Sequence, residues 1–279
     1  MRRFPIAILS AWVVCGFIVG FAQAENWPQW RGPKNDGIGT SKNLPIEWDV
    51  AAGRNVAWKL PLPGPAGATP VVWGNKLFLT STDKDDLLLI CVSTDDGTEQ
   101  WRKVVGVGDK TAHGDEGNSC SPSPSTDGKH VWVMMGTGDL ACYDFTGKEV
   151  WKKDLQKEYG KFDIQFGMTS SPVLDGERLF LQLIHSNGAK VVALDKTTGK
   201  ELWAVKRVSD ARAECEHSYA SPIMHQEGDV MQLITHGADY IIAYDVKDGR
   251  EIWRCGGLNP KEKYNPTFAW SLRPFPRPG

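Results

Sequence analysis

The sequence lacks a surplus of positive charge, since 32 Lys and Arg stand against 34 Asp and Glu, a formal net charge of −2. This balance excludes a basic stripe for nucleic acid or a polybasic membrane patch. No segment has a sustained helical period with caps, which excludes a helix bundle and favours an all-β chain. No spacing of His, Cys and carboxylates matches a known zinc or calcium loop.

What the sequence does contain is a repeat of about fifty residues. Four times a Trp stands four residues after a Gly, and the Trp-to-Trp intervals are 50, 52 and 50. The pairs are Gly97/Trp101, Gly147/Trp151, Gly199/Trp203 and Gly249/Trp253. A Ser-Pro or Thr-Pro marker runs in phase at Pro70, Pro122, Pro172 and Pro222. Two markers with one period define a repeat architecture such as a propeller.

One repeat contains four strand-like runs separated by turns. In the third repeat these runs are residues 171–174, 179–184, 191–194 and 201–205, with Asp175-Gly176 as the first turn. Four antiparallel strands in fifty residues make one blade of a β-propeller. We therefore predict an all-β propeller with four complete four-stranded blades.

The phrase that ends each repeat has a packing explanation. Its Gly supplies the positive φ of a tight turn, and its Asp accepts hydrogen bonds from turn amides. The indole is expected to lie flat between neighbouring blades, with a small residue leaving room for it. Cys91 and Cys142 occupy this small-residue position and are expected to be buried. The alternative, in which the tryptophans stack on a ligand, conflicts with their identical placement in every repeat.

The phrase Ala-x-Asp-x-x-x-Gly-x-x-x-Trp resembles the tryptophan-docking repeat of the pyrroloquinoline quinone (PQQ)-type propellers. That superfamily includes eight-bladed quinoprotein alcohol dehydrogenases and a propeller lipoprotein that assists outer-membrane protein assembly. The resemblance covers residues 58–255, and it implies the fold more than the function, because one fold serves enzymes and scaffolds alike. The opening Trp27-Pro-Gln-Trp-Arg-Gly-Pro33 resembles a group of exported bacterial PQQ-like repeat proteins.

Residues 1–24 are predicted to be a signal peptide. Arg2 and Arg3 precede an apolar stretch from Ile6 to Phe21, and Ala22-Gln-Ala24 forms a small-x-small cleavage site. An uncleaved anchor is the alternative. We expect an exported protein, periplasmic or at the cell surface, with no membrane span after cleavage. Its predicted parts are a lead-in at 25–57, blades at 58–255 and an irregular Pro-rich tail at 256–279.

The repeats predict an incomplete ring. Trp58 stands in a segment that resembles the fourth strand of a blade whose other three strands are missing. Four full blades and this orphan N-terminal strand are expected to be the N-terminal part of a seven- or eight-bladed ring, which makes the chain a fragment. A compact four-bladed ring is the alternative.

Long loops before the Ser-Pro markers are expected to meet around the central channel. They carry residue types that bind metals or move protons. The candidate ligand-site residues at this channel mouth are His113, Asp115, Glu116, Asn118, Gln165, Met168, Arg212, Glu214, Glu216 and His217. An ordinary polar rim and a catalytic site are the other interpretations. Solvated turn positions are expected for four further histidines, His130, His185, His225 and His236.

The leading functional hypothesis is an exported, non-catalytic propeller that presents loops to a protein or a cell-surface polymer. The alternative implied by the resemblance is a PQQ-dependent dehydrogenase of alcohols or sugars, with PQQ and calcium as cofactors, and Glu116, Asn118 and Glu214 as residue types that suit calcium. The PQQ alcohol dehydrogenases typically carry a disulfide between adjacent cysteines, and no such pair occurs here. Polysaccharide hydrolysis is a third possibility, for which no paired-carboxylate motif is found. No metal site, catalytic residue or cofactor is assigned.

Overall fold

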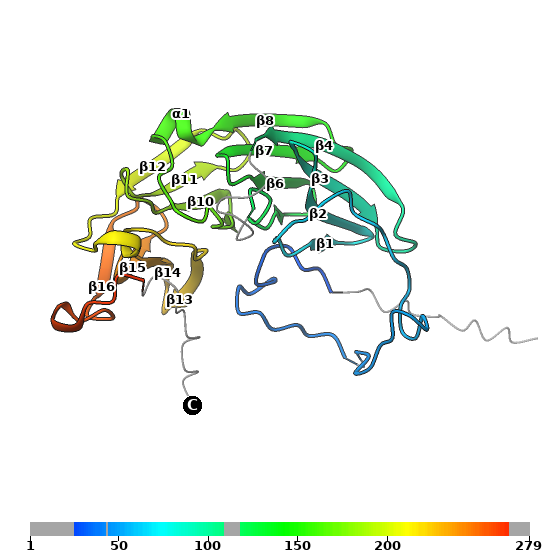
Figure 1. The fold of residues 1–279 in the computed structure, drawn as a ribbon, viewed down its shortest axis with the longest axis horizontal. Coiled ribbons are helices and arrows are strands. Elements are labelled where there is room, and N and C mark those ends of the chain that lie inside the picture. The colour runs from blue at the N-terminus through cyan, green and yellow to red at the C-terminus, as the bar shows by residue number, and fades with distance from the viewer. Residues whose placement is uncertain (1–24, 43, 109–117, 268–279) are drawn as a thin grey trace, which may run out of the picture.

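The computed structural model describes residues 25–42, 44–108 and 118–267. Its strands form four sheets, each with four antiparallel strands that follow one another in chain order. Figure 1 shows the sheets side by side as successive blades along an arc. The predicted all-β propeller fold is therefore confirmed.

The blades are assembled from strands of two to nine residues. Blade 1 holds β1 (Val71–Trp73), β2 (Lys76–Asp83), β3 (Asp86–Ser93) and β4 (Glu99–Val107). Blade 2 holds β5 (Ser125–Thr126), β6 (His130–Met134), β7 (Asp139–Asp144) and β8 (Glu149–Asp154). Blade 3 holds β9 (Val173–Asp175), β10 (Arg178–Leu183), β11 (Lys190–Asp195) and β12 (Glu201–Lys206). Blade 4 holds β13 (Ile223–Glu227), β14 (Val230–Gly237), β15 (Tyr240–Asp245) and β16 (Glu251–Cys255).

Helical structure in the described chain is limited to three short pieces. The helix α1 (Leu155–Tyr159) begins at Asp154, whose side chain accepts a hydrogen bond from the backbone of Lys157. The other two are 3₁₀ turns, η1 (Ala213–Glu216) and η2 (Lys261–Lys263). Five residues are too few to produce a helical period in the sequence. No described helix is long and apolar enough to cross a membrane.

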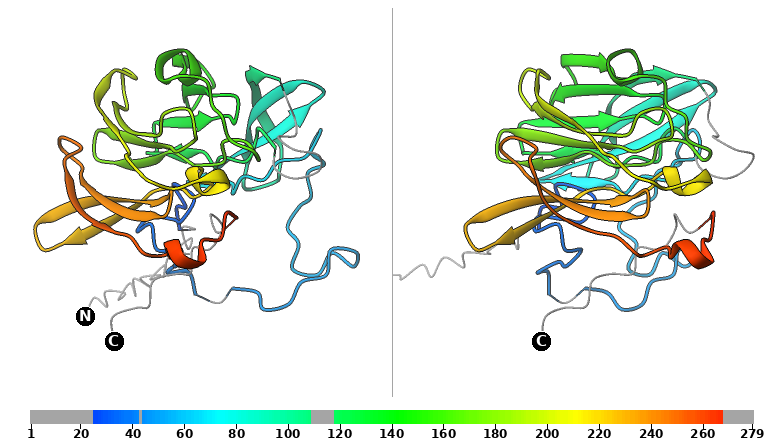
Figure 2. Two further views of the ribbon diagram at one scale, coloured as in Figure 1. Left: turned by 60° about the vertical axis from the view of Figure 1, so that its left-hand side comes forward. Right: turned by 90° about the vertical axis from the view of Figure 1, so that its left-hand side faces the viewer.

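Each pair of neighbouring blades encloses its own apolar core. In β3, residues 87–92 form an unbroken apolar run because both faces of the strand are covered, and all six side chains are buried. The outer strand β4 instead alternates between half-buried and exposed residues over its first six positions. Separate buried clusters join blade 1 to blade 2, blade 2 to blade 3 and blade 3 to blade 4. Figure 2 shows these stacked blades from two further sides.

The tryptophans of the repeat lie against the glycine turn of the next blade. A Cβ on each of these glycines would come within 3.0 Å of the facing indole, so only glycine fits there. The docked pairs are Trp58 with Gly97, Trp101 with Gly147, Trp151 with Gly199 and Trp203 with Gly249. Each indole Nε1 also donates a hydrogen bond to a carbonyl of the same turn. The acceptors are Thr94, Phe145, Lys196 and Val246, at 2.9–3.2 Å.

The orphan strand differs from its prediction. Trp58 docks on blade 1, and with Leu60 it packs against a buried cluster that includes Leu88 and Ile90. The residues around Trp58 form no strand, however, and the nearest pairing is an isolated bridge between Asp49 and Arg54. A strand requires a hydrogen-bonded neighbour, and no described segment lies alongside to supply one.

Candidate binding site at the channel mouth

Hydroxyl groups join the innermost edges of the four blades in a ladder. Thr69 N donates to Ser123 Oγ at 2.9 Å, and Ser123 N donates to Ser171 Oγ at 2.9 Å. Ser171 N then donates to Ser221 Oγ at 2.8 Å. Each oxygen that accepts an amide proton here also keeps its own hydroxyl proton for a further hydrogen bond.

This ladder corrects the register of the Ser-Pro marker in blade 2. The sequence places the marker at Pro122, whereas the residue equivalent to Ser171 and Ser221 is Ser123, which precedes Pro124. The segment Ser121-Pro-Ser-Pro124 contains the marker twice, and periodicity alone selects the wrong copy. Only the hydrogen bonds between blades distinguish the two.

The ladder borders a pocket of about 340 Å³ at the centre of the arc. Its lining combines hydroxyls with two large aromatic side chains and one imidazole. The lining residues are Trp30, Gly67, Ser121, Ser123, Thr169, Ser171, Tyr219, Ala220, Ser221 and His236. This set contains no Lys, Arg, Asp or Glu. The pocket is therefore suited to neutral polar groups and to stacking on an aromatic face.

The lead-in segment brings Trp30 into this pocket. Trp27 exchanges two backbone hydrogen bonds of 2.9 Å with Val72 in blade 1. Pro28 O accepts from Thr126 N in blade 2 at 2.8 Å, and Gln29 Oε1 accepts from the backbone of blade 3 at 3.1 Å. The opening motif thus crosses three blades in succession. Sequence reasoning used this motif only as a family feature and missed its structural role.

Three of the predicted site residues, His113, Asp115 and Glu116, lie outside the described residues. Asn118 stabilises a turn, because its Oδ1 accepts from Cys120 N at 2.9 Å. Met168 is fully buried in the core between blades 2 and 3, and Gln165 is exposed away from the pocket lining. The expectation that Met168 and Gln165 face the channel mouth is therefore wrong, because the loop turns its apolar side chain into the core.

The loop before blade 4 also divides its predicted residues between different surroundings. The guanidinium of Arg212 lies 4.4 Å from the ring centre of Tyr264, and Glu214 and Glu216 lie in η1. None of these three side chains lines the pocket. His217 stands edge-on to Tyr219, with ring centres 6.5 Å apart, so it supports a pocket residue rather than lining the pocket.

His217 also belongs to a polar cluster at the rim. Its Nε2 lies 3.3 Å from Ser186 Oγ, and Ser186 Oγ donates to Asp163 Oδ2 at 2.9 Å. Because Ser186 uses its proton on Asp163, it accepts from His217 Nε2–H. The order His–Ser–Asp leaves no base between the carboxylate and the hydroxyl, so this cluster is not a catalytic triad. Burial lowers the pKa of His217, which keeps its ring neutral near pH 7.

Two of the four histidines expected in solvated turns are not there. His225 is exposed and lies 3.1 Å from Glu227. His185 is only 2 % exposed and packs on Phe162, and His236 lines the pocket. Burial lowers the pKa of both His185 and His236. The prediction failed because antiparallel strands return to the same end of the blade, so the hairpin after each second strand lies near the channel loops.

The described mouth does not fit PQQ or calcium. No group of three or more His, Cys, Asp or Glu within residues 25–42, 44–108 and 118–267 is arranged to hold a metal ion. Calcium needs several oxygen ligands with carboxylates among them, and the carboxylates of PQQ call for cationic partners. The ten pocket residues supply neither kind of charge.

Four-stranded blades, each with a tryptophan docked on the glycine turn of the next, define a PQQ-like β-propeller. A family model described as outer membrane protein assembly factor BamB matches residues 38–120 and 110–261. The chain therefore belongs to this family of PQQ-like repeat proteins, and the resemblance drawn from the docking phrase is confirmed. No curated protein sequence matches the chain.

Solved structures share the fold at low sequence identity. The quinohemoprotein alcohol dehydrogenase of Comamonas testosteroni is 15% identical with a TM-score of 0.63, over 84% of this chain and 41% of that one. BamB from Moraxella catarrhalis is 15% identical with a TM-score of 0.51, over 72% and 55%. The alcohol dehydrogenase ADHIIG of Pseudomonas putida HK5 is 17% identical with a TM-score of 0.54, over 72% and 35%. The chain thus spans about a third to just over half of these relatives' length.

Proposed function

We propose that this chain is a non-catalytic binding propeller that uses its channel mouth to hold a protein segment or a cell-surface polymer. The observation that carries the proposal is the chemistry of the pocket lining. Trp30 and Tyr219 offer aromatic faces, and the serine ladder offers hydroxyl protons. An uncharged lining of this kind suits peptide groups or sugar hydroxyls, and it holds no general acid, base or nucleophile pair.

The cellular location belongs to the same proposal. The predicted signal peptide at residues 1–24 and the family description both support export, to the periplasm or the cell surface. A propeller that binds extended peptides there suits a role in protein assembly. Membership in the family supports that role without choosing it over enzymatic relatives.

Binding measurements test the proposal. Isothermal titration with neutral oligosaccharides and with uncharged extended peptides is expected to give heat for one of the two classes. Tyr219→Ala is expected to weaken that binding at least tenfold, since one aromatic platform is lost. The matched control is His225→Ala, which removes an exposed side chain from a distant hairpin. Absence of binding to both classes, or equal loss in the control, would contradict the proposal.

The alternative is a PQQ-dependent dehydrogenase, and the fold similarity to the Comamonas testosteroni enzyme is the observation that favours it. Titration with PQQ and calcium distinguishes the two functions. We expect no tight binding, because the described mouth lacks charged partners. Dye-linked oxidation of an alcohol or sugar after reconstitution would establish the alternative instead.

A further inference from the structure

The lead-in contains a fifth docking turn. Residues Trp48-Asp49-Val-Ala-Ala-Gly53-Arg54 match Tyr244-Asp245-Val-Lys-Asp-Gly249-Arg250 position by position. The backbone hydrogen bonds also match, since Asp49 N donates to Arg54 O at 3.0 Å and Asp245 N donates to Arg250 O at 2.8 Å. Both aspartates accept from amides inside the turn at 2.9 Å. Trp58 follows Gly53 by five residues rather than four, which hides this phrase in the sequence.

This turn is unused, whereas the other four docking turns each receive a tryptophan. Gly53 has a φ of +71°, like the other docking glycines, yet a Cβ built on it would meet no atom within 4 Å. The carbonyl of Val50 stands where Val246 O accepts the indole proton of Trp203. It accepts instead from the Nζ of Lys59, an exposed side chain that another donor can displace.

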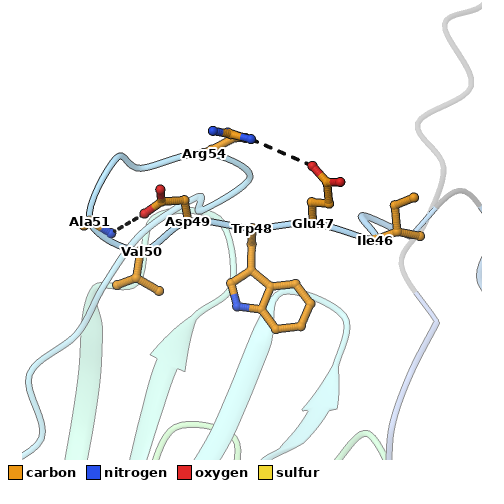
Figure 3. A pocket seen from close by; sticks show the side chains of 7 residues that line it. All are labelled: Ile46, Glu47, Trp48, Asp49, Val50, Ala51 and Arg54. Carbon is orange, nitrogen blue, oxygen red and sulfur yellow. Dashed lines mark hydrogen bonds and ion pairs between the residues drawn. The ribbon is translucent and has the colours of Figure 1, made fainter.

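The apolar residues beside this turn are exposed where their counterparts are buried. Ile46 is 93 % exposed and Trp48 is 68 % exposed, and Figure 3 shows both side chains directed away from the turn. The equivalent residues of blades 3 and 4 are at most 2 % exposed, namely Val192, Leu194, Ile242 and Tyr244. Burial of these side chains against another blade is favourable, since apolar surface leaves water.

One docking tryptophan is unused as well. Trp253 is 36 % exposed, whereas its counterpart Trp203 is 8 % exposed. Its Nε1 donates to Gln232 of its own blade at 2.9 Å rather than to a following turn. The chain therefore presents one free docking tryptophan on blade 4 and one free docking turn at residues 49–54. Figures 1 and 2 place β16 and the segment around residue 50 at opposite ends of the arc.

We propose that the two free ends bind each other between two copies of this chain. Trp253 of one copy lies on Gly53 of the second copy and donates to the Val50 carbonyl, as Trp203 does with Gly249 and Val246. The same contact covers Ile46 and Trp48. A second copy is the occupant that the structure favours, because one chain carries both complementary halves and holds them too far apart to meet each other. The interface is head-to-tail, and it closes into a ring or grows according to the rotation between copies.

Sedimentation velocity on residues 25–279, which hold every described element, tests this proposal. The wild-type chain is expected to associate as its concentration rises. Gly53→Val and Trp253→Ala are each expected to weaken association at least tenfold. Two matched controls are expected to associate like wild type. Gly176→Val alters another exposed turn glycine of positive φ with no neighbour within 4 Å, and Leu202→Ala truncates an exposed apolar side chain of β12.

Mixing the two disabled variants gives the sharpest result. The Gly53→Val copy keeps Trp253 and the Trp253→Ala copy keeps Gly53, so the mixture is expected to form pairs that grow no further. Circular dichroism melts of each variant establish that it is folded. A wild-type chain that stays monomeric at every soluble concentration would overturn the proposal. Association that survives both substitutions, or a mixture that forms no pairs, would overturn it too.

Discussion

The docked indole is the residue-scale unit from which this propeller is built. Trp203 is 8 % exposed and lies between blades 3 and 4, and its Nε1 donates to Val246 O at 3.2 Å. A Cβ on Gly249 would come 2.7 Å from the indole Cε3. The glycine is thus required twice, by its φ of +74° and by the ring that covers it.

Replacing Trp203 with Ala is expected to cost about 3–5 kcal/mol of unfolding free energy, because it leaves a large cavity between two blades. Urea unfolding followed by circular dichroism measures the loss. The control is Leu202→Ala on the neighbouring exposed face of β12, where a change within about 0.5 kcal/mol is expected. Equal losses for the two variants would contradict a role of the docking position in packing.

Two glycines separate backbone strain from docking. Gly176 and Gly199 both have positive φ, +55° and +69°, but only Gly199 lies under an indole, where a Cβ would come 2.8 Å from the ring of Trp151. Gly176→Ala is expected to cost about 1–2 kcal/mol from strain. Gly199→Ala is expected to cost about 1–3 kcal/mol more, because the methyl group displaces the ring. Thermal melts compare the two, and equal shifts would argue against close docking.

At the scale of the element, each turn before a docking glycine is organised by an aspartate. Asp195 Oδ1 accepts from Thr198 N and Thr198 Oγ1, both at 2.7 Å, and Asp144 accepts from Thr146 in the same way. Hydrogen bonds from these threonine side chains are the largest cause that lowers the pKa of Asp144 and Asp195. The ionised carboxylate therefore stabilises the hairpin between the last two strands of a blade.

These turns predict a loss of stability in acid. A carboxylate whose pKa is lowered on folding contributes its full stabilisation above the unfolded pKa, about 3.9 for Asp, and loses it as the pH falls through the lowered folded value. Urea midpoints are thus expected to fall below about pH 4. Asp195→Ala is expected to be less stable at pH 7 and to lose less on acidification. An unchanged pH dependence in this variant would remove Asp195 from the explanation.

At the scale of the whole molecule, stability is distributed over cores between blades, and most thiols lie inside them. Cys91, Cys120, Cys142 and Cys215 are buried, and Cys255 is exposed on β16. Burial raises the pKa of Cys91 and Cys120 to about 11 and that of Cys142 to about 12. Such thiols are largely protonated and inaccessible near neutral pH.

Thiol labelling of residues 25–279 at pH 8 is expected to show one fast site, Cys255, and four sites that react only on unfolding. Cys255→Ser is expected to remove the fast phase and leave the slow phase unchanged. Mass spectrometry of the labelled peptides identifies each site. Fast reaction at Cys91 or Cys142 would contradict the close packing between blades.

The sequence alone determined the architecture, because the period, the docking phrase and the turn residues are local features that recur in each blade. Trp203, Gly249 and Asp195 were thus assigned their roles without coordinates. Positions that depend on how separate segments meet were decided only by the tertiary structure. Trp30 reaches the pocket through the path of the lead-in across three blades, and His236 reaches it through the return of an antiparallel strand.

Met168 turned into the core for a related reason: its loop must fill the space between two blades, and no local pattern encodes that space. The Ser-Pro register in blade 2 and the free turn at Gly53 followed the same rule. Each differs from the repeat by one or two residues, and a periodic pattern cannot distinguish such neighbours. Hydrogen bonds between blades can distinguish them, because each amide has one partner within reach.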